Sequence, residues 1–380
     1  MTEGPIIQGW CPGALRPMLS GDGLVVRVRP RGGHLSQDQA AGIATLAAIH
    51  GNGLIDLSAR ANVQLRGVTE GSHQELIAGL DDLGLIDATP RAETARNIIV
   101  TPFWTEGDGT QDMANALMQA LATPDAMPLP GKFGYGVDTA STPVLRNTSA
   151  DIRVERAAGG WMVWADGTAT GAIVASSKDA IAAVQDLTAW FAESGGITAG
   201  RGRMAALIAR GAVLPPPFQV AEIPPAPPLH QAPGLLQIGA LIGFEFGQLQ
   251  AQTLAQLAEL GPLRVTPWRM LLLEGAKTLP HIQGLITRAD DPMLRVSACT
   301  GAPRCLQAHQ PTRDLARRLA PLLPAGTLHI SGCTKGCAHP GPADTTLVAT
   351  PHGFDLIRNG TAADLPTERA LSPFLTELPQ

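Results

Sequence analysis

The sequence is poor in aromatic residues, in net charge and in long apolar runs. Aromatic side chains make up 4% of the 380 residues, with a single tyrosine, Tyr135. So few rings exclude an aromatic platform for stacking nucleic-acid bases. The formal net charge of −5 gives no general attraction to nucleic acid or to an anionic membrane surface. We therefore expect neither nucleic acid nor a membrane among the partners of this protein.

Targeting signals are missing as well. No apolar run approaches the ~20 residues that a membrane-spanning helix needs. The first residues, Met1-Thr-Glu-Gly-Pro, lack the basic and apolar regions of a secretory signal peptide. These features predict a soluble, cytoplasmic protein. Hydrophobic residues nevertheless make up 44% of the chain, enough to bury large cores, and the length predicts two or more domains.

Four of the five cysteines lie in the last quarter of the chain, in two short groups. They form Cys299-x5-Cys305 and Cys333-x3-Cys337, and a helix-like segment separates the two groups. Four thiolates in two groups can converge on one inorganic centre, and an iron–sulfur cluster is the first to consider. Neither pair has the Cys-x2-Cys spacing that is usual at structural zinc sites, so zinc ranks below a cluster.

Two further interpretations of the cysteines stay open. Two disulfides suit a small secreted chain better than this long one, and four unrelated thiols in a core are also common. Three glycines beside the cysteines favour a shared centre, because they leave room for backbone to wrap a bulky cofactor and N–H groups to bond sulfur. They are Gly301, Gly332 and Gly336. The fifth cysteine, Cys11, lies far away in sequence, and we expect a packed thiol there.

The chain is expected to be a duplication around a proline-rich segment. Residues 214–233 contain eight prolines in twenty positions, which predicts an extended linker. A strand, a helix and a second strand are predicted before it, and the same order recurs after it. The earlier elements are 23–29, 33–50 with Ser36 as N-cap, and 61–68; the later ones are 236–247, 249–260 and 263–275.

The two copies align closely. Their closing segments match without a gap, from Leu57 on Val265 to Gly67 on Gly275, and their helix starts align Leu35 with Leu249. Accidental similarity is the alternative, since strand–helix–strand patterns are common. Each copy is followed by a larger α/β region. An α+β fold with pseudo-twofold symmetry follows, and its central cleft is a natural place for a large ligand.

The residues that carry the chemistry resemble a known family. The duplicated unit, the cysteine pairs and Ser58-Ala-Arg60-Ala-Asn62-Val-Gln64-Leu-Arg66-Gly together resemble the nitrite/sulfite reductase superfamily. Within it, the sequence is most similar to the precorrin-3B synthases of aerobic cobalamin biosynthesis. That similarity rests on Cys11-Pro-Gly-Ala-Leu-Arg-Pro-Met, Ser20-Gly-Asp-Gly and Ser331-Gly-Cys-Thr-Lys-Gly-Cys-Ala-His-Pro.

The resemblance implies a domain plan. It comprises two ferredoxin-like half-domains and two α/β domains of the nitrite/sulfite reductase type, the second carrying the cluster. The boundaries we expect are 1–80 for the first half-domain, 90–213 for the first α/β domain, 214–233 for the linker, 234–280 for the second half-domain and 290–375 for the second α/β domain.

The resemblance also implies a reaction and cofactors. The reaction is a monooxygenation, the O2- and reductant-dependent hydroxylation of precorrin-3A at C20 with closure of a γ-lactone. A [4Fe–4S] cluster is implied on Cys299, Cys305, Cys333 and Cys337. A mononuclear non-haem iron is associated with the family, but no ligand spacing for it stands out among the nine histidines. The electron donor is expected to be an NADH-linked reductase or a ferredoxin-type protein.

A precorrin carries many carboxylates, which an arginine fork can bind bidentately. Alternation predicts that Arg60, Asn62, Gln64 and Arg66 share one face of a strand, as substrate contacts or as a solvent-facing surface. The resemblance implies anion-binding and catalytic roles for three cations. Arg60 and Arg96 match two arginines of the superfamily, and Lys132 matches the first of two active-site lysines.

Gly134 takes the place of the second lysine. One alternative function is a sirohaem-dependent sulfite or nitrite reductase. The missing lysine weakens that alternative, because the reduction of a small anion needs cations around it. A non-catalytic tetrapyrrole carrier is the other alternative. His339, two residues after Cys337, is interpreted either as a group that tunes the cluster or as a turn-capping histidine.

Overall fold

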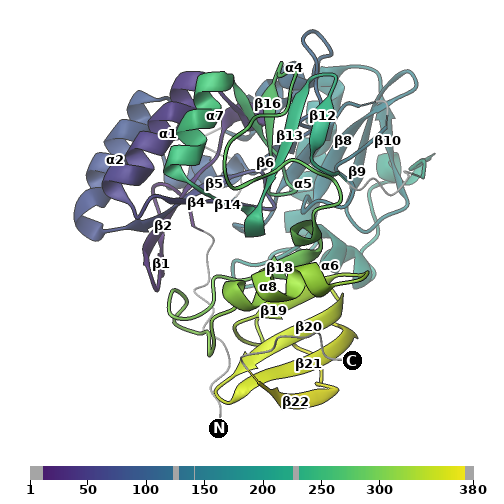
Figure 1. Cartoon of the computed structure of the whole chain (residues 1–380). Coiled ribbons are helices and arrows are strands. Elements are labelled where there is room, and N and C mark those ends of the chain that lie inside the picture. Colours follow the sequence, from purple (N-terminus) through teal and green to yellow (C-terminus); the bar gives the residue numbers. More distant parts are fainter. Residues whose placement is uncertain (1–11, 123–127, 141, 226–230, 373–380) are drawn as a thin grey trace.

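Two similar α+β halves form the upper left and upper centre of the molecule in Figure 1. The structure is a computed structural model that describes residues 12–122, 128–140, 142–225 and 231–372. Cys11 lies outside these residues. The first half consists of β1 (Met18–Ser20), β2 (Gly23–Val28), η1 (Arg31–Gly33), β3 (His34–Leu35), α1 (Gln37–His50), β4 (Leu54–Leu57), β5 (Val63–Val68) and α2 (Glu70–Asp82).

The second half repeats this order without the last helix. It consists of β12 (Gly234–Leu236), β13 (Gly239–Phe244), η3 (Glu245–Gly247), β14 (Gln248–Gln250), α7 (Ala251–Leu260), β15 (Leu263–Val265) and β16 (Leu271–Glu274). One sheet has five strands in the order β1-β2-β5-β4-β14, and the other has the order β12-β13-β16-β15-β3 with a sixth strand, β17 (Leu285–Ile286), paired to β13. Each half therefore gives one short strand to the sheet of the other half.

This exchange is symmetric in its register. Leu35 of β3 pairs with Leu263 of β15, and Leu249 of β14 pairs with Ile55 of β4. All four side chains are buried in one hydrophobic core that both halves share. Because the alignment of the two copies matches these residues to one another, the duplication inferred from the sequence is present in the fold.

The backbone repeats the same unusual conformations in both copies. Ala61 and Arg269, which the alignment matches, have φ of 53° and 59°. Gly32 and Phe246, a second matched pair, have φ of 60° and 59°. Positive φ is sterically costly for residues with a Cβ, so its recurrence at matched positions marks a shared backbone path rather than a common motif.

Helix α1 begins where the sequence predicts. The Ser36 side chain accepts a hydrogen bond from the Gln39 N–H, and the Gln39 side chain accepts one from the Ser36 N–H, which forms a capping box. Small residues of α1, Ala40, Ala44 and Ala47, are buried and let α7 pack closely against it. Figure 1 shows α2, α1 and α7 side by side over the two sheets.

The first α/β domain follows the first half. Its elements are α3 (Pro90–Ala95), β6 (Ile98–Val100), α4 (Thr110–Leu121), β7 (Tyr135–Asp138), β8 (Ile152–Ala157), β9 (Gly160–Ala165), β10 (Thr170–Val174), α5 (Ser177–Glu193), α6 (Met204–Ala209), η2 (Pro216–Gln219) and β11 (Ala221–Glu222). Strands β6, β7 and β8 are parallel neighbours, and antiparallel strands complete the sheet.

The second α/β domain forms the lower part of Figure 1 and has the same plan. Its elements are β17 (Leu285–Ile286), which pairs with β13, then η4 (Pro292–Arg295), β18 (Val296–Ala298), α8 (Arg313–Leu319), η5 (Ala320–Leu322), β19 (Leu328–Ser331), β20 (Ala343–Thr350), β21 (Gly353–Gly360) and β22 (Glu368–Leu371). Strands β18, β19 and β20 are parallel neighbours, and β21 and β22 are antiparallel.

The proline-rich segment is only partly a linker. Within residues 214–233, η2 buries Phe218 in the core of the first α/β domain, and β11 pairs with β10 at the edge of that sheet. Prolines are tolerated at the start of η2, because the first N–H groups of a helix have no partner within it. In the part of the chain that the structure describes, no helix is long and apolar enough to cross a membrane.

Two matched polar clusters lie where the strands are exchanged. In one, Glu274 accepts a hydrogen bond from Arg264 at 2.6 Å and contacts His34 at 3.2 Å. In the other, the aligned residues carry the opposite charges, because Asp56 matches Arg264 and Arg66 matches Glu274. Burial raises the pKa of Glu274, but the hydrogen bonds and charges of His34 and Arg264 outweigh it and lower the pKa to about 2.

A pH-dependent stability follows from Glu274. Its folded pKa lies below the unfolded value, so its contribution is present above about pH 4.5 and is lost as the pH falls toward about 2. We expect Glu274→Gln to lower the free energy of unfolding by roughly 1.5–3 kcal/mol at pH 7. Urea unfolding of the wild type and of Glu274→Gln at pH 7, 4 and 3 measures the difference in their free energies of unfolding. This difference should become smaller as the pH falls. A difference that stays constant would contradict this role.

Candidate active site

Two adjacent parallel strands bring the cysteine groups together. Cys299 follows β18 directly, and Cys333 lies two residues after β19. These strands pair in register from Val296 with Leu328 to Ala298 with Ile330, so their carboxyl ends meet at one edge of the sheet. Loops that leave such an edge side by side are a common place for ligand sites in open α/β sheets.

Backbone hydrogen bonds join the two cysteine loops. The Gly332 N–H donates to the Cys299 sulfur at 3.1 Å, and the His309 N–H donates to the Gly332 carbonyl at 2.9 Å. The Cys305 N–H donates to the Gly301 carbonyl at 2.8 Å. The loops are therefore tied to each other near the thiols, and the N–H to sulfur contact is the one expected around a cluster.

Glycine is required at this junction. A Cβ on Gly332 would lie 2.6 Å from the Ala308 Cβ and 3.2 Å from the Cys299 sulfur. Gly301 has φ of 70°, and a Cβ there would lie 2.8 Å from the Thr312 nitrogen. The chain thus leaves room beside the thiols that side chains at these two positions would fill.

The four thiols influence one another electrostatically. Burial raises the pKa of Cys299, and the N–H groups of Gly332 and Gly301 offset part of this. Burial also raises the pKa of Cys337; Lys335 lowers it, while the charges of the three other cysteines raise it further. Among the described residues, however, no three His, Cys, Asp or Glu side chains stand closely enough to hold a metal ion. The thiols are neighbours without forming a closed coordination shell.

A cavity of about 310 Å³ adjoins the second cysteine loop. The loop contributes Ala338 and His339, the second half contributes Phe246, Trp268 and Arg269, and the loop before Arg60 contributes Ala59. Three parts of the chain therefore meet around this space. The His339 ring nitrogen Nε2 lies 3.1 Å from the Pro342 carbonyl, as expected for a histidine that caps a turn.

Arg269, which is half-buried, lines this cavity, and the fully buried His329 packs against His339 of its lining; sequence reasoning missed both. Arg269 donates to the Ala338 carbonyl at 3.1 Å, and burial lowers its pKa. His329 on β19 is fully buried, and burial, with the charges of His339 and Arg269, lowers its pKa to about 4. The alignment of the two copies could have pointed to Arg269, because it matches Ala61, the residue after the predicted site residue Arg60. His329 lies in an ordinary strand pattern and had none.

The polar face of β5 is covered rather than exposed to solvent. Arg66 is 6% exposed and donates to Asp22 at 2.6 and 2.9 Å, to Asp56 at 3.0 Å and to Ser20 at 3.0 Å. Burial raises the pKa of Asp22, but Arg66 outweighs it and lowers the pKa overall. Arg66 therefore does not face solvent, and its partners are two carboxylates and a hydroxyl of the protein itself.

A chain of hydrogen bonds leads from this face to Arg313 of the second α/β domain. Asp56, which pairs with Arg66, accepts from Gln248 at 2.6 Å, and Gln248 accepts from Arg313 at 2.5 Å. Arg313 lies close enough to Cys299 for the two to interact electrostatically. Sequence reasoning did not single out Gln248 or Arg313, because only the strand exchange brings them beside Asp56.

The structure places Arg60 near the predicted lysine loop. Arg60 donates to the Ser149 carbonyl at 3.3 Å and hydroxyl at 2.7 Å. A Cβ on Gly134 would lie 3.2 Å from Arg60 Nη1 and 2.5 Å from Asn97 Nδ2. A side chain at position 134 would therefore clash with Asn97 and crowd Arg60. Lys132 is exposed nearby in sequence.

The other predicted site residues are more enclosed. Asn62 is 5% exposed, and its Nδ2 has no hydrogen-bond partner among the described residues. The Gln64 side chain accepts from Arg27 at 2.6 and 3.1 Å. Arg96 is buried, pairs with Asp87 at 2.7 Å and donates to the Arg29 carbonyl at 2.8 Å.

Comparisons with known proteins agree with this architecture. A family model, the nitrite/sulfite reductase ferredoxin-like half domain, matches residues 16–83. A precorrin-3B synthase from a Sinorhizobium species is 30% identical over 412 residues, which cover 96% of this chain and 86% of the relative. The solved structure of the NirA protein of Mycobacterium tuberculosis superposes with a TM-score of 0.63 at 18% identity, over 91% of this chain and 77% of that chain. That likeness concerns the fold alone.

Removing Arg66 tests whether it supports the fold. Arg66→Ala leaves the Asp22 and Asp56 carboxylates without their cation, so we expect a loss of roughly 3–5 kcal/mol in the free energy of unfolding. The matched control is Arg31→Ala, an exposed arginine paired with Asp87, which should cost less than about 1 kcal/mol. Chemical denaturation measures both, and equal effects would rule out a special role for Arg66.

Proposed function

Because the chain belongs to the precorrin-3B synthase family, we propose that it catalyses the O2- and reductant-dependent hydroxylation of precorrin-3A at C20, with closure of a γ-lactone. Membership makes it an oxidoreductase of the monooxygenase class. The reaction would place it in aerobic cobalamin biosynthesis. The observation that supports this most is a cavity around which the second cysteine loop, the second half and Ala59, the residue before Arg60, meet.

We propose that Cys299, Cys305, Cys333 and Cys337 hold a [4Fe–4S] cluster. Their donor set, the Gly332 N–H to sulfur contact and the space kept by glycine fit such a group. When bound, the cluster would supply single electrons for O2 activation. Arg313, half-buried beside Cys299, would offset part of its negative charge. The described residues offer no ligand set for a mononuclear iron, so we assign no step to one.

The residues of the chain would bind and orient the tetrapyrrole. Arg60 is half-buried, not fully enclosed, so its guanidinium can reach a substrate carboxylate. Asn62, Gln64 and Lys132 are proposed as further contacts from the same region. Arg66 and Arg96 already bind carboxylates of the protein, so we propose that they act by holding this surface in place. Orientation matters because only one meso carbon reacts.

The electron donor would be an NADH-linked reductase or a ferredoxin-type protein that reaches the cysteine loops. Cys337 is exposed, which supports electron entry on that side. We place the enzyme in the cytoplasm, because free thiols that bind a cluster persist in a reducing compartment.

Product mass tests the reaction. The purified protein is incubated with precorrin-3A, a reductant and 18O2, and we expect a product that contains one oxygen atom from O2. Substrate that is bound but unchanged would indicate a carrier instead. Intense sirohaem absorption bands in the purified protein, with reduction of sulfite or nitrite, would indicate a sirohaem reductase.

Replacing one cysteine tests the cluster. Cys337→Ser should lose most of the iron and acid-labile sulfide together with turnover, because serine is a poor ligand for a cluster. Cys11→Ser is the matched control and should keep both, since we expect the fifth cysteine to be no ligand. Iron and sulfide per chain are measured after anaerobic purification. Full iron content in Cys337→Ser would end the cluster assignment.

A further inference from the structure

Two arginines from different domains meet at one hydroxyl group beside the proposed site. Ser149 Oγ accepts from Arg60 Nη2 at 2.7 Å and from Arg203 Nη1 at 3.1 Å. We propose that Arg60, Arg203 and Ser149 form a clamp for one carboxylate of the tetrapyrrole substrate. This inference rests on the proposed function and adds Arg203 and Ser149, which the family motifs do not include.

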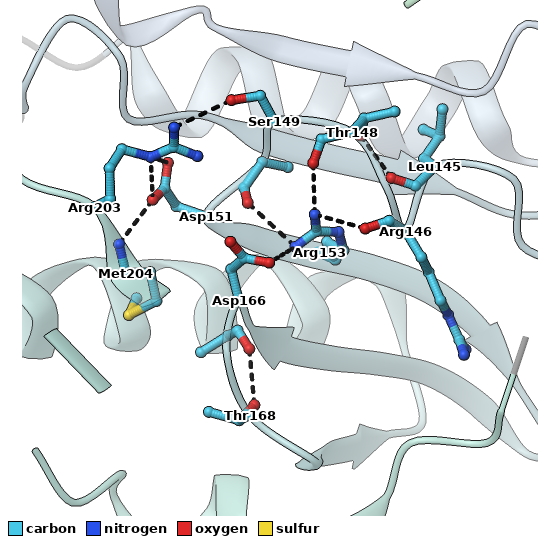
Figure 2. Close-up of polar contacts among 12 residues, drawn as sticks. Leu145, Arg146, Thr148, Ser149, Asp151, Arg153, Asp166, Thr168, Arg203 and Met204 are labelled. Carbon is cyan, nitrogen blue, oxygen red and sulfur yellow. Dashed lines mark hydrogen bonds and ion pairs between the residues drawn. The ribbon is translucent and has the colours of Figure 1, made fainter. Parts of the chain in front are cut away.

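Arg203 is held rigidly in place. It lies just before α6, and Figure 2 shows its side chain between Ser149 and Asp151. Asp151 is fully buried and accepts from Arg203 Nε at 2.8 and 3.1 Å. The same carboxylate accepts from the backbone N–H groups of Met204 at 2.8 Å and Gly134 at 3.0 Å. Asp151 is thus fixed by four contacts, and it fixes the direction of the guanidinium.

Arg60 reaches the same hydroxyl from a tight loop of the first half. The Ser58 hydroxyl accepts from the N–H groups of Arg60 at 3.3 Å and Asn62 at 3.2 Å, and the Ser58 N–H donates to the Asn62 carbonyl at 2.9 Å. Gly134 keeps free the space beside Arg60 Nη1. Both guanidinium groups are therefore aimed before any ligand arrives, which lowers the entropic cost of binding.

The hydrogen-bonding capacity of Ser149 identifies the ligand chemistry. A hydroxyl has two acceptor lone pairs and one hydrogen. The two arginines use both lone pairs, and among the described residues nothing accepts the Ser149 hydrogen. Arg60 Nη1 also donates to the Ser149 carbonyl and Arg203 Nε to Asp151, so two guanidinium groups and one O–H group bring three donor groups to this point. A carboxylate, which only accepts, matches that arrangement.

The three side chains are also accessible. Arg60 and Ser149 are half-buried, and the side chain of Arg203 is 33% exposed. Partial burial strengthens a charge-assisted hydrogen bond while leaving a path for the ligand. The neighbouring Arg153 differs, because it is buried, pairs with Asp166 at 2.7 Å and donates to the Thr148 carbonyl at 2.7 Å (Figure 2). Arg153 supports the loop instead of binding a ligand.

Ser149→Ala tests the clamp, because it keeps the Arg203–Asp151 ion pair intact. The probe is uroporphyrin III, a stable tetrapyrrole with eight carboxylates, measured by equilibrium dialysis with the full-length protein. A tetracationic pyridinium porphyrin of similar size serves as the comparison. We expect the wild type to prefer uroporphyrin III and Ser149→Ala to bind it roughly tenfold more weakly. The affinity for the cationic porphyrin should not change.

Further variants separate the clamp from a structural role. Arg203→Lys keeps a cation for Asp151 but loses the fork, and it should weaken uroporphyrin III binding without lowering the thermal unfolding midpoint of the protein. Arg201→Ala removes one exposed positive charge two residues away and should bind like the wild type. In an Arg60→Ala background, Ser149→Ala should add less than about twofold, since the two groups act on one carboxylate.

Two outcomes overturn the clamp. One is an unchanged affinity of Ser149→Ala for uroporphyrin III, and the other is a wild-type protein that binds both porphyrins equally well. Neither outcome decides the proposed reaction, which depends on oxygen incorporation into precorrin-3A. Conversely, a clamp that binds uroporphyrin III in a protein that forms no oxidised product would leave a tetrapyrrole carrier as the function.

Discussion

The exchange of short strands between the two halves is the constraint on which the site depends. It places one polar cluster on each side of the shared core, and each cluster also contacts one α/β domain. Arg264, paired with Glu274, donates to the carbonyls of Pro102 and Trp104 in the first α/β domain. On the other side, Gln248 donates to Asp56 of the first half and accepts from Arg313 of the second α/β domain. The domains are thus oriented by matched junctions with reversed charges.

This arrangement explains how separate loops converge. The Arg60 loop belongs to the first half, the loop of Trp268 and Arg269 to the second, and the cysteine loops to the second α/β domain. None of these is adjacent in sequence, and a shift of one domain would open the cavity between them. Buried ion pairs suit such a junction, because breaking one leaves an uncompensated charge and so disfavours any other orientation.

Much of the fold was open to prediction from the sequence. Alternation, the Ser36 cap and the alignment of Leu35 with Leu249 predict the duplicated halves, and the family model and the NirA structure agree. The strand exchange was not predictable, because a two- or three-residue strand such as β3 carries no pattern that names its partner. For the same reason, the contacts of Gln248 and Arg313 with Asp56 and with each other could not be predicted from the sequence. The proline-rich segment was expected to be a linker, but the first positions of a short helix such as η2 also accept proline.

The candidate site could be predicted from the sequence only in part. The cysteine spacing predicted that the thiols are neighbours, and their mutual effect on the pKa of Cys337 agrees with that. Arg66 and Arg60 look equivalent in an alternating strand, yet only the fold shows that Arg66 is enclosed by carboxylates.

The exchange of strands also bears on how such a chain arises. One half alone has a spare strand and an open sheet edge, which two identical copies could satisfy reciprocally, so the duplicated chain is equivalent to a domain-swapped dimer fused into one polypeptide.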